Sequence, residues 1–258
     1  MAILEIRQLS KSFGGLQAVL DFNCVVNPGE IHALIGPNGA GKSTVFNLVC
    51  NLIKPDSGKV LLNGENLVGL PPHRITEKGI GRTFQNVRLF KNISVRANVA
   101  VAVNAARGYG IFQSILNSGP GSALLRSVYE EADQVLEIVG LTHRANSLPK
   151  NLPYGEQKRV ELARALACPV KVLLLDEPTT GMNPTESETM LELIQSLRQR
   201  GIAILLVEHN MRVVMGISDI VTVMNFGQVI AEGTPVEVCN NKRVISAYLG
   251  ERRNARAQ

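Results

Sequence analysis

The sequence predicts an α/β protein that combines a mainly parallel core sheet, an antiparallel β subdomain near the N-terminus and an inserted helical subdomain. Three short apolar runs, residues 31–35, 172–175 and 202–207, have the length and composition of buried core strands. Helical patterns separate these runs, and strands that alternate with helices are typical of a parallel sheet. Residues 220–224 and 228–231 indicate two further strands joined by a three-residue turn.

The antiparallel subdomain is predicted from two β-rich stretches, residues 1–30 and 52–70. In the first stretch, apolar residues are spaced through polar ones and Asn27-Pro28-Gly29 marks a turn. In the second stretch, Asn63-Gly64 is a hairpin signal between two short runs.

The helical insertion is predicted between residues 88 and 165. Ser127 and Glu130 have the spacing of a capping box, which predicts a helix that starts at Ser127 and ends at Gly140. Residues 107–121 are rich in Gly and Ser, and they indicate a loop with a short helix.

We therefore expect a single domain of 258 residues, globular because 45% of its residues are hydrophobic and 19% are charged. The expected parts are a core with its β subdomain over 1–87 and 166–250, a helical subdomain over 88–165, and a short basic tail over 251–258.

Composition and charge limit the classes of ligand that this chain could bind. Trp is absent and aromatic residues make up 4% of the chain, which argues against single-stranded nucleic acid held by stacked rings. The net charge of +5 suits a nucleotide, an anionic membrane or nucleic acid, and a mildly basic solvated surface explains it equally well.

There is no signal-peptide layout and no apolar run near the ~18 residues that span a bilayer, so we expect a soluble or peripheral protein. The four cysteines match no metal or redox spacing, and we expect free thiols in a reducing compartment.

Residues 36–43, which we call the phosphate loop, fit the pattern G-x-x-x-x-G-K-[S/T] at every required position. They lie between a predicted strand and a predicted helix start, where glycines let successive backbone N–H groups turn toward an anion. Lys42 can reach the terminal phosphates of a nucleotide, and the Ser43 hydroxyl can bind Mg²⁺. The predicted nucleotide-binding residues are Gly36, Pro37, Asn38, Gly39, Ala40, Gly41, Lys42, Ser43 and Thr44.

Asp176 and Glu177 directly follow the buried strand at 172–175. Ligands of parallel sheets bind beyond the carboxyl ends of the strands, so both side chains are expected near the phosphate loop. Asp176 suits the shell of a magnesium ion, and Glu177 suits a base that activates water. A helix cap or a solvated pair at a strand end is the alternative.

His209 and Gln85 are weaker candidates. His209 follows Glu208 at the end of another apolar strand, so it is expected at the same edge, in contact with a γ-phosphate; a structural histidine is the alternative. Gln85 lies where the core joins the helical insertion, and its side-chain carbonyl could bind Mg²⁺ or the attacking water.

In this order and spacing, the phosphate loop, Gln85, Asp176-Glu177 and His209 resemble the ATP-binding subunits of ABC transporters, over residues 3 to about 250. The resemblance implies a P-loop NTPase fold with ATP and Mg²⁺ bound. It implies that Gln85 belongs to the Q-loop, that Glu177 is the catalytic base and that His209 is the switch histidine. Phe13 lies where the family stacks an aromatic ring on adenine; packing in the core is the alternative.

The signature segment, residues 152–156, departs from the family pattern. It reads Leu-Pro-Tyr-Gly-Glu in place of Leu-Ser-Gly-Gly-Gln. In the family, the serine gives a hydroxyl and a backbone N–H to the γ-phosphate across a dimer, and Pro153 has neither. Because Gly155 and the following helix start are retained, we expect a weakened contact. Asn183 is a second departure, since the family usually has Asp there.

Tyr154 in the signature segment, the run 181–184 and the run 207–211 are similar to one subfamily, the LivG-type ATPases of branched-chain amino acid importers. That resemblance implies uptake of leucine, isoleucine and valine, with amides or urea as alternative cargo, at the cytoplasmic face of the bacterial inner membrane. The implied partners are a LivF-type second ATPase, two membrane-spanning permease subunits and, indirectly, a periplasmic or lipid-anchored substrate-binding protein. Nucleic acid is not an expected partner.

Other P-loop proteins fit less well. An exporter ATPase, such as one for lipopolysaccharide, is expected to keep the Ser-Gly-Gly signature. An ABC-type ATPase that acts on DNA or the ribosome usually carries long coiled-coil insertions or a second ATPase domain, and no heptad run is present. A GTPase should contain an Asn-Lys-x-Asp motif. Residues 99–103 and 108–120 are candidate docking surface for the membrane partner, with plain helix packing as an equal alternative.

Overall fold

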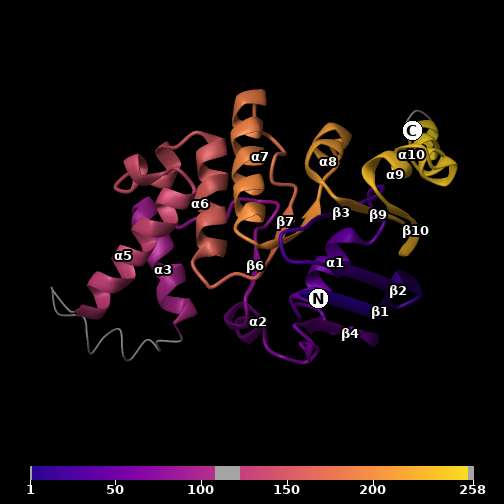
Figure 1. Ribbon diagram of the computed structural model, residues 1–258, viewed down its shortest axis with the longest axis horizontal. Helices are drawn as coiled ribbons and strands as arrows, with labels where there is room; N and C mark the ends of the chain where they lie inside the picture. Colours follow the sequence, from indigo (N-terminus) through magenta and orange to yellow (C-terminus); the bar gives the residue numbers. More distant parts are fainter. Residues whose placement is uncertain (1, 108–122, 255–258) are drawn as a thin grey trace. The chain divides into compact units, whose positions relative to one another are not determined.

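The computed structural model describes residues 2–107 and 123–254. The chain forms two compact units, each described below by itself (Figure 1). The first unit comprises Met1–Ile75, Lys171–Glu177 and Ile194–Gln258, and the second comprises Thr76–Val170 and Pro178–Leu193.

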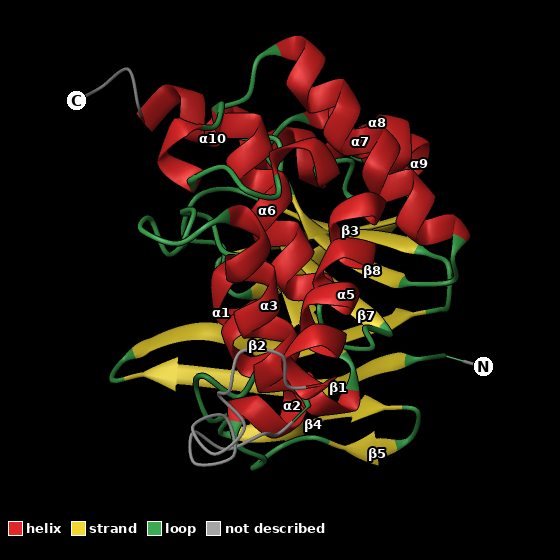
Figure 2. Ribbon diagram, turned by 90° about the vertical axis from the view of Figure 1, so that its left-hand side faces the viewer, coloured by secondary structure: helices red, strands yellow, loops and turns green. Residues whose placement is uncertain are grey.

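The strands of the first unit form an antiparallel sheet and a mainly parallel sheet, and Figure 2 draws the strands as yellow arrows. The antiparallel sheet has the order β2-β1-β4-β5, with β1 at Leu4–Phe13, β2 at Leu16–Val26, β4 at Ser57–Leu62 and β5 at Glu65–Asn66. The other sheet contains, in order, β10-β9-β3-β8-β7, with β3 at Ile31–Ile35, β7 at Val172–Asp176, β8 at Ala203–Val207, β9 at Ile220–Asn225 and β10 at Gln228–Gly233. Neighbours in this sheet are parallel except the β9–β10 hairpin, which confirms the predicted fold class.

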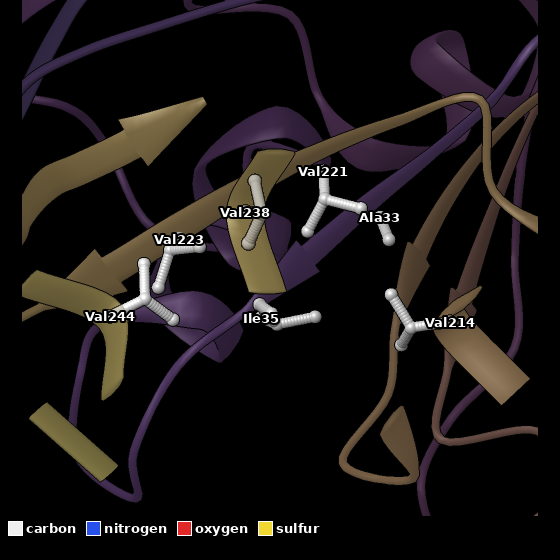
Figure 3. Close-up of a cluster of buried hydrophobic side chains, with 7 residues drawn as sticks. All are labelled: Ala33, Ile35, Val214, Val221, Val223, Val238 and Val244. Atoms are coloured by element: carbon white, nitrogen blue, oxygen red, sulfur yellow. The ribbon is translucent and has the colours of Figure 1, made fainter. Parts of the chain in front are cut away.

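The central strands are buried on both faces, as expected for a parallel sheet covered on each side. All five residues of β3, of β7 and of β8 are buried. Along β3, Ala33 and Ile35 face one side of the sheet, where they join the cluster in Figure 3 with residues of β9 and of the helices α8 (Met211–Ile217), α9 (Pro235–Cys239) and α10 (Lys242–Asn254). This cluster anchors the strand that leads into the phosphate loop.

The register of the parallel strands aligns their carboxyl ends. Leu34 of β3 pairs with Val207 of β8, and Val207 pairs with Asp176 of β7. The segments that follow these three residues therefore leave the sheet at the same edge. The first of them is the phosphate loop, which leads into the helix α1 at Lys42–Val49.

The second unit is mainly helical. The helices α3, α5 and α6 lie side by side in Figure 1. Its elements are β6 at Ile80–Arg82, α3 at Val95–Ala106, α5 at Ala123–Ile138, η1 at Thr142–Arg144, η2 at Pro149–Asn151 and α6 at Tyr154–Leu166. Two of the four boundaries between the units fall within α2 (Pro72–Lys78) and α7 (Pro184–Gln199), and the other two lie on either side of β7, after Val170 and after Glu177.

The predicted helix start at Ser127 is wrong. Ser127 lies inside α5, which begins at least as early as Ala123, and its hydroxyl donates to the carbonyl of Leu124 at 2.9 Å rather than capping a helix. A Ser-x-x-Glu pattern also occurs within helices, where the Ser hydroxyl bonds back to the preceding turn. The buried residues of α5 are spaced four apart along one face, at Val128, Ala132 and Leu136.

The expected docking surface at 99–103 is largely interior. Val99, Ala100 and Val103 are buried in α3, and only Val101 of the apolar residues there is substantially exposed. Helix packing therefore explains this run. Residues 108–120, the other candidate, lie outside the described residues.

The remaining expectations concern the cysteines, the tail and the membrane. All four cysteines are free thiols. Helix α10 continues through Asn254, so it occupies the first half of the expected basic tail, and residues 255–258 lie outside the described part. Within the described residues, none of the helices combines the length and apolarity that crossing a membrane requires.

Candidate functional site

The phosphate loop is held in its shape by close packing against other segments of the first unit. Gly36 has φ 148°, and a β-carbon there would lie 2.1 Å from the carbonyl oxygen of Met224. Gly41 has φ 108°, and a β-carbon there would lie 2.3 Å from the carbonyl oxygen of Ala18. Only glycine satisfies both the backbone angle and the space at these two positions. The turn between β9 and β10 adds a further tie, because the N–H of Gly227 donates to Ala40 O at 3.0 Å.

Lys42 is buried and stays within the loop. Its Nζ donates to the carbonyl oxygens of Gly36 at 2.7 Å and Pro37 at 2.8 Å. The ammonium group therefore sits among backbone groups of the loop, at the start of α1. The N–H groups of a helix's first turn have no intrahelical acceptor, and the dipole adds positive potential there. This arrangement suits a polyanion such as a nucleotide phosphate.

Asp176 and Glu177 lie at the carboxyl end of β7 in the same unit, 7% and 9% exposed respectively. The N–H of Glu177 donates to Val207 O at 2.9 Å, which extends the parallel pairing by one residue. Glu177 has φ 49°, in the left-handed region that residues other than glycine seldom adopt. Backbone strain of this kind concentrates at functional sites, where it fixes the direction of a side chain.

His209 lies beside Glu177. Its Nε2 is 2.7 Å from Glu177 Oε1, and the histidine side chain is 39% exposed. Glu208, which sequence reasoning did not select, fixes the loop that carries His209. Its buried carboxylate accepts the N–H groups of His209 at 3.0 Å and Asn210 at 3.3 Å. The position of this acidic residue directly before the candidate histidine is the sequence feature by which Glu208 could have been selected.

The first unit thus brings together the phosphate loop, Asp176, Glu177 and His209. Their donor set fits Mg²⁺, because a hydroxyl on Ser43 and a carboxylate on Asp176 are the hard oxygen ligands that this ion prefers. No group of three or more His, Cys, Asp and Glu side chains suited to a metal occurs among the residues described. A magnesium ion shared with nucleotide phosphates needs no such group.

Phe13 ends β1 and is 45% exposed, so the alternative of core packing does not hold for it. Lys11 Nζ lies 5.6 Å from the centre of its ring. An exposed aromatic face with a cation at one side remains free to stack on a planar ligand.

Gln85 and Gly155 belong to the second unit. Gln85 follows β6 and is exposed, and its backbone carbonyl accepts a hydrogen bond from Lys158 Nζ at 2.8 Å. Gly155 lies at the start of α6, where its N–H donates to Glu186 Oε1 at 3.3 Å. A β-carbon at Gly155 would lie 2.8 Å from Glu186 Cδ, so any larger residue there would have to displace the Glu186 side chain. Glu186 was not selected from the sequence, and no local pattern links it to Gly155.

This fold and this site define a nucleotide-binding protein of the P-loop class. Comparison with known families matches residues 19–180 to a model described as ABC transporter. Residues 228–253 match a second model, described as branched-chain amino acid ATP-binding cassette transporter.

Curated relatives match along nearly the whole chain. The high-affinity branched-chain amino acid transport ATP-binding protein LivG of Escherichia coli K12 is 44% identical over 96% of this chain and 98% of its own length. The corresponding protein BraF of Pseudomonas aeruginosa is 42% identical with the same coverage. The lipopolysaccharide export system ATP-binding protein LptB of Haemophilus influenzae is 34% identical over 97% of this chain and 98% of its own length.

Solved structures of ATP-binding cassettes match the fold of this chain. The ADP conformation of MJ1267, an ATP-binding cassette of an ABC transporter, has a TM-score of 0.84 and 29% identity, over 97% of this chain and 99% of that one. A dimeric post-hydrolysis cassette, MJ0796 with ADP and Pi, has a TM-score of 0.73 and 26% identity, over 90% and 98%. The chain belongs to the ATP-binding proteins of the ABC transporter family.

Proposed function

We propose that this chain binds and hydrolyses ATP to energise an importer of branched-chain amino acids, namely leucine, isoleucine and valine. The cargo is supported by the LivG and BraF relatives and by the family match at residues 228–253. One observation best supports the ATPase activity: Glu177 and His209 are in contact at the carboxyl end of the parallel sheet. The phosphate loop leaves β3 at the same end of the sheet.

ATP binds through its phosphates to residues 36–44, with Lys42 neutralising charge on the terminal phosphates. Its adenine ring stacks on the exposed face of Phe13. Mg²⁺ would be held by Ser43, Gln85 and Asp176, where it would neutralise phosphate charge and orient the γ-phosphate.

Glu177 accepts a proton from the attacking water as the water oxygen bonds to the γ-phosphorus and the bond to the bridging oxygen of ADP breaks. His209 holds the Glu177 carboxylate in place and contacts the γ-phosphate. Since this contact exists only while the γ-phosphate is attached, it links hydrolysis to a change in the loop after β8.

The active form is a dimer in which the signature segment of each ATPase subunit, with Gly155 in this chain, contacts the γ-phosphate bound by the other subunit. The dimeric MJ0796 cassette supports this arrangement. We propose a LivF-type chain as the second subunit, because Pro153 leaves this chain's own signature segment without the serine hydroxyl and N–H. An asymmetric pair tolerates one weakened site.

The pair works at the cytoplasmic face of the bacterial inner membrane as a peripheral complex. Its other partners are two permease subunits and, indirectly, a substrate-binding protein. The helical subdomain, residues 88–165, passes the motion of the closing dimer to the permease.

Co-purification of the chain from membranes, followed by reconstitution of the complex in liposomes, tests the proposal. We expect ATP-dependent uptake of labelled leucine, isoleucine and valine, and loss of uptake with Glu177→Gln. Uptake of urea or amides instead would correct the cargo, and outward lipid transport would favour an exporter. A complete complex that does not hydrolyse ATP would refute the proposed activity.

A further inference from the structure

One face of α6 carries three charged side chains that bond to the backbone around Gln85. We call them the α6 polar row: Lys158, Glu161 and Arg164. Their spacing of three residues places them on one side of the helix. Each bonds to the segment 84–88, and all of these residues lie within the second unit.

Most hydrogen bonds of the row go to the backbone of two consecutive residues, Phe84 and Gln85. Lys158 Nζ donates to Gln85 O at 2.8 Å and to Phe84 O at 3.4 Å. Glu161 Oε1 accepts the N–H of Phe84 at 3.2 Å. Arg164 adds a bond to the carbonyl of Arg88. The backbone that carries Gln85 is thereby fixed from both its donor and acceptor sides, while the Gln85 side chain remains exposed.

Burying the charged groups of the α6 polar row costs free energy. Lys158 and Glu161 are each 4% exposed, and charged side chains at such depth are rare unless they are paired and hydrogen-bonded. Burial raises the pKa of Glu161, against the opposing effect of the positive charge on Lys158. Apolar residues would pack a helix at least as well, so packing alone does not account for two buried charges aimed at the same backbone.

The row begins next to the signature segment. Lys158 lies four residues after Tyr154, and its Nζ is 6.0 Å from the centre of the Tyr154 ring. Gly155 lies in the same helix turn. A single helix of 13 residues therefore carries the signature glycine at its N-terminus and the groups that hold Gln85 one turn further on. Helical hydrogen bonds keep the distance between these two points fixed.

We propose that Lys158 is a positioning residue for Gln85. By holding the carbonyl of Gln85, Lys158 fixes the backbone from which the exposed Gln85 side chain extends. This inference rests on the proposed role of Gln85 as a magnesium ligand.

The test is the Mg²⁺ dependence of ATP hydrolysis by the complete transporter. Lys158→Met keeps the length of the side chain and removes its donor. We expect its apparent Mg²⁺ affinity to fall roughly 10-fold or more, as for other residues that orient metal ligands. Binding of ATP in the presence of EDTA should be unchanged, since Lys42 and the phosphate loop are untouched. Lys158→Arg, which keeps donors, should recover most of the affinity.

Two comparisons make the result decisive. Lys150→Met, at an exposed site in the same unit, should leave the Mg²⁺ dependence unchanged. Gln85→Ala reports the proposed function: it should shift the Mg²⁺ dependence, and Lys158→Met added to it should cause little further change. A shift with Gln85→Ala but none with Lys158→Met overturns the positioning role and leaves the proposed function intact. No shift with Gln85→Ala overturns the magnesium role of Gln85 itself.

A purely structural role predicts a different pattern. It would lower the stability of Lys158→Met and reduce its activity equally at all Mg²⁺ concentrations, and that outcome also overturns the inference. Should Lys158→Met not fold, Lys158→Gln replaces it, because the shorter amide keeps polarity but reaches less far. The same loss of Mg²⁺ affinity is expected.

Discussion

The Nε2 atom of His209 lies 2.7 Å from Oε1 of Glu177, although 32 positions separate the two residues along the chain. The parallel register of β7 and β8 creates this contact, because Asp176 pairs with Val207 and the chain leaves both strands at the same edge. The positive φ of Glu177 turns its side chain toward that edge. The carboxylate is thus oriented by the backbone on one side and by an imidazole on the other.

Glu177→Gln should nearly stop turnover while ATP binding persists. The amide has almost the same shape but cannot accept a proton from water, and general base catalysis contributes roughly 10²–10⁴-fold in rate. Single-turnover hydrolysis and a binding titration, both on the complete transporter, measure the two effects. Glu188→Gln, at an exposed position on α7, is the matched control. Turnover within a few-fold of the parent protein would remove Glu177 from the role of base.

Lys42→Ala should weaken nucleotide binding itself. Charge-assisted hydrogen bonds contribute about 1.5–3 kcal/mol, which corresponds to roughly a 10- to 150-fold rise in the Kd for ATP. Removing the ammonium also removes the bonds to Gly36 and Pro37 that it makes within the loop. Titration with a labelled ATP analogue, under conditions that prevent hydrolysis, measures the effect.

The control for Lys42 is Lys59→Ala, since Lys59 is exposed on β4 of the same unit. Its Kd for ATP should match that of the parent protein. If Lys42→Ala binds ATP as tightly as Lys59→Ala does, the phosphate loop is not where the terminal phosphates bind.

The central strands could be predicted because their apolar runs are short, uninterrupted and bounded by turn residues. The runs at 31–35, 172–175 and 202–207 became β3, β7 and β8 with bounds within one residue. The edge at which Glu177 and His209 gather was also predictable, because parallel strands send their carboxyl ends to one side. Local pattern was sufficient wherever a whole strand is buried on both faces.

Contacts between distant segments could not be predicted in the same way. Lys158 reaches the carbonyl of Gln85 across 73 residues, and nothing in either segment indicates the other. The mistaken helix start at Ser127 has a related cause, because its spacing to Glu130 is that of a cap, and only the preceding helical turn shows that it is interior. Helix boundaries depend on neighbours that a local pattern does not contain.

Glu186 should stabilise the second unit through two separate contacts. Its N–H donates to Asn183 Oδ1 at 2.9 Å and its Oε2 accepts the N–H of Asn183 at 3.1 Å, the reciprocal bonds of a capping box. Its Oε1 also accepts the N–H of Gly155. We expect Glu186→Ala to lower the free energy of unfolding by about 1 kcal/mol, measured by urea denaturation.

Each capping bond joins the side chain of one residue to the backbone N–H of the other, and alanine keeps that N–H. The losses of Asn183→Ala and Glu186→Ala should therefore be nearly additive in the double variant. A loss for Glu186→Ala no larger than that of a Glu-to-Ala change elsewhere in the helix would show that its capping contacts contribute nothing. Glu192→Ala, at a site further along α7, serves as the reference for a plain Glu-to-Ala change.

His32 of β3 is buried in a hydrogen-bonded network that requires a protonated ring. Its Nδ1 lies 3.1 Å from the carbonyl oxygen of Val25, which can only accept. Its Nε2 lies 2.8 Å from Thr222 Oγ1, and that hydroxyl donates to Glu232 Oε2 at 2.7 Å, so it accepts from the imidazole. Both ring nitrogens therefore carry protons, which makes the side chain an imidazolium.

Stability should consequently fall in alkaline solution. Burial alone would lower the pKa of His32, but Cys24, Glu30 and Glu232 outweigh it and raise the pKa from 6.5 to about 10. A raised folded-state pKa contributes stability that is complete below pH 6.5 and is lost as the pH rises through about 10, with a slope of at most about 1.4 kcal/mol per pH unit.

Urea denaturation of the parent protein and of His32→Gln at pH 6.5, 8 and 9.5 isolates this contribution, because other groups titrate equally in both. The gap between the two proteins should narrow steadily with pH, whereas His73→Gln, at an exposed site, should run parallel to the parent. A gap for His32→Gln that stays constant over this range would mean that the ring is neutral and that the Thr222 hydroxyl points toward it.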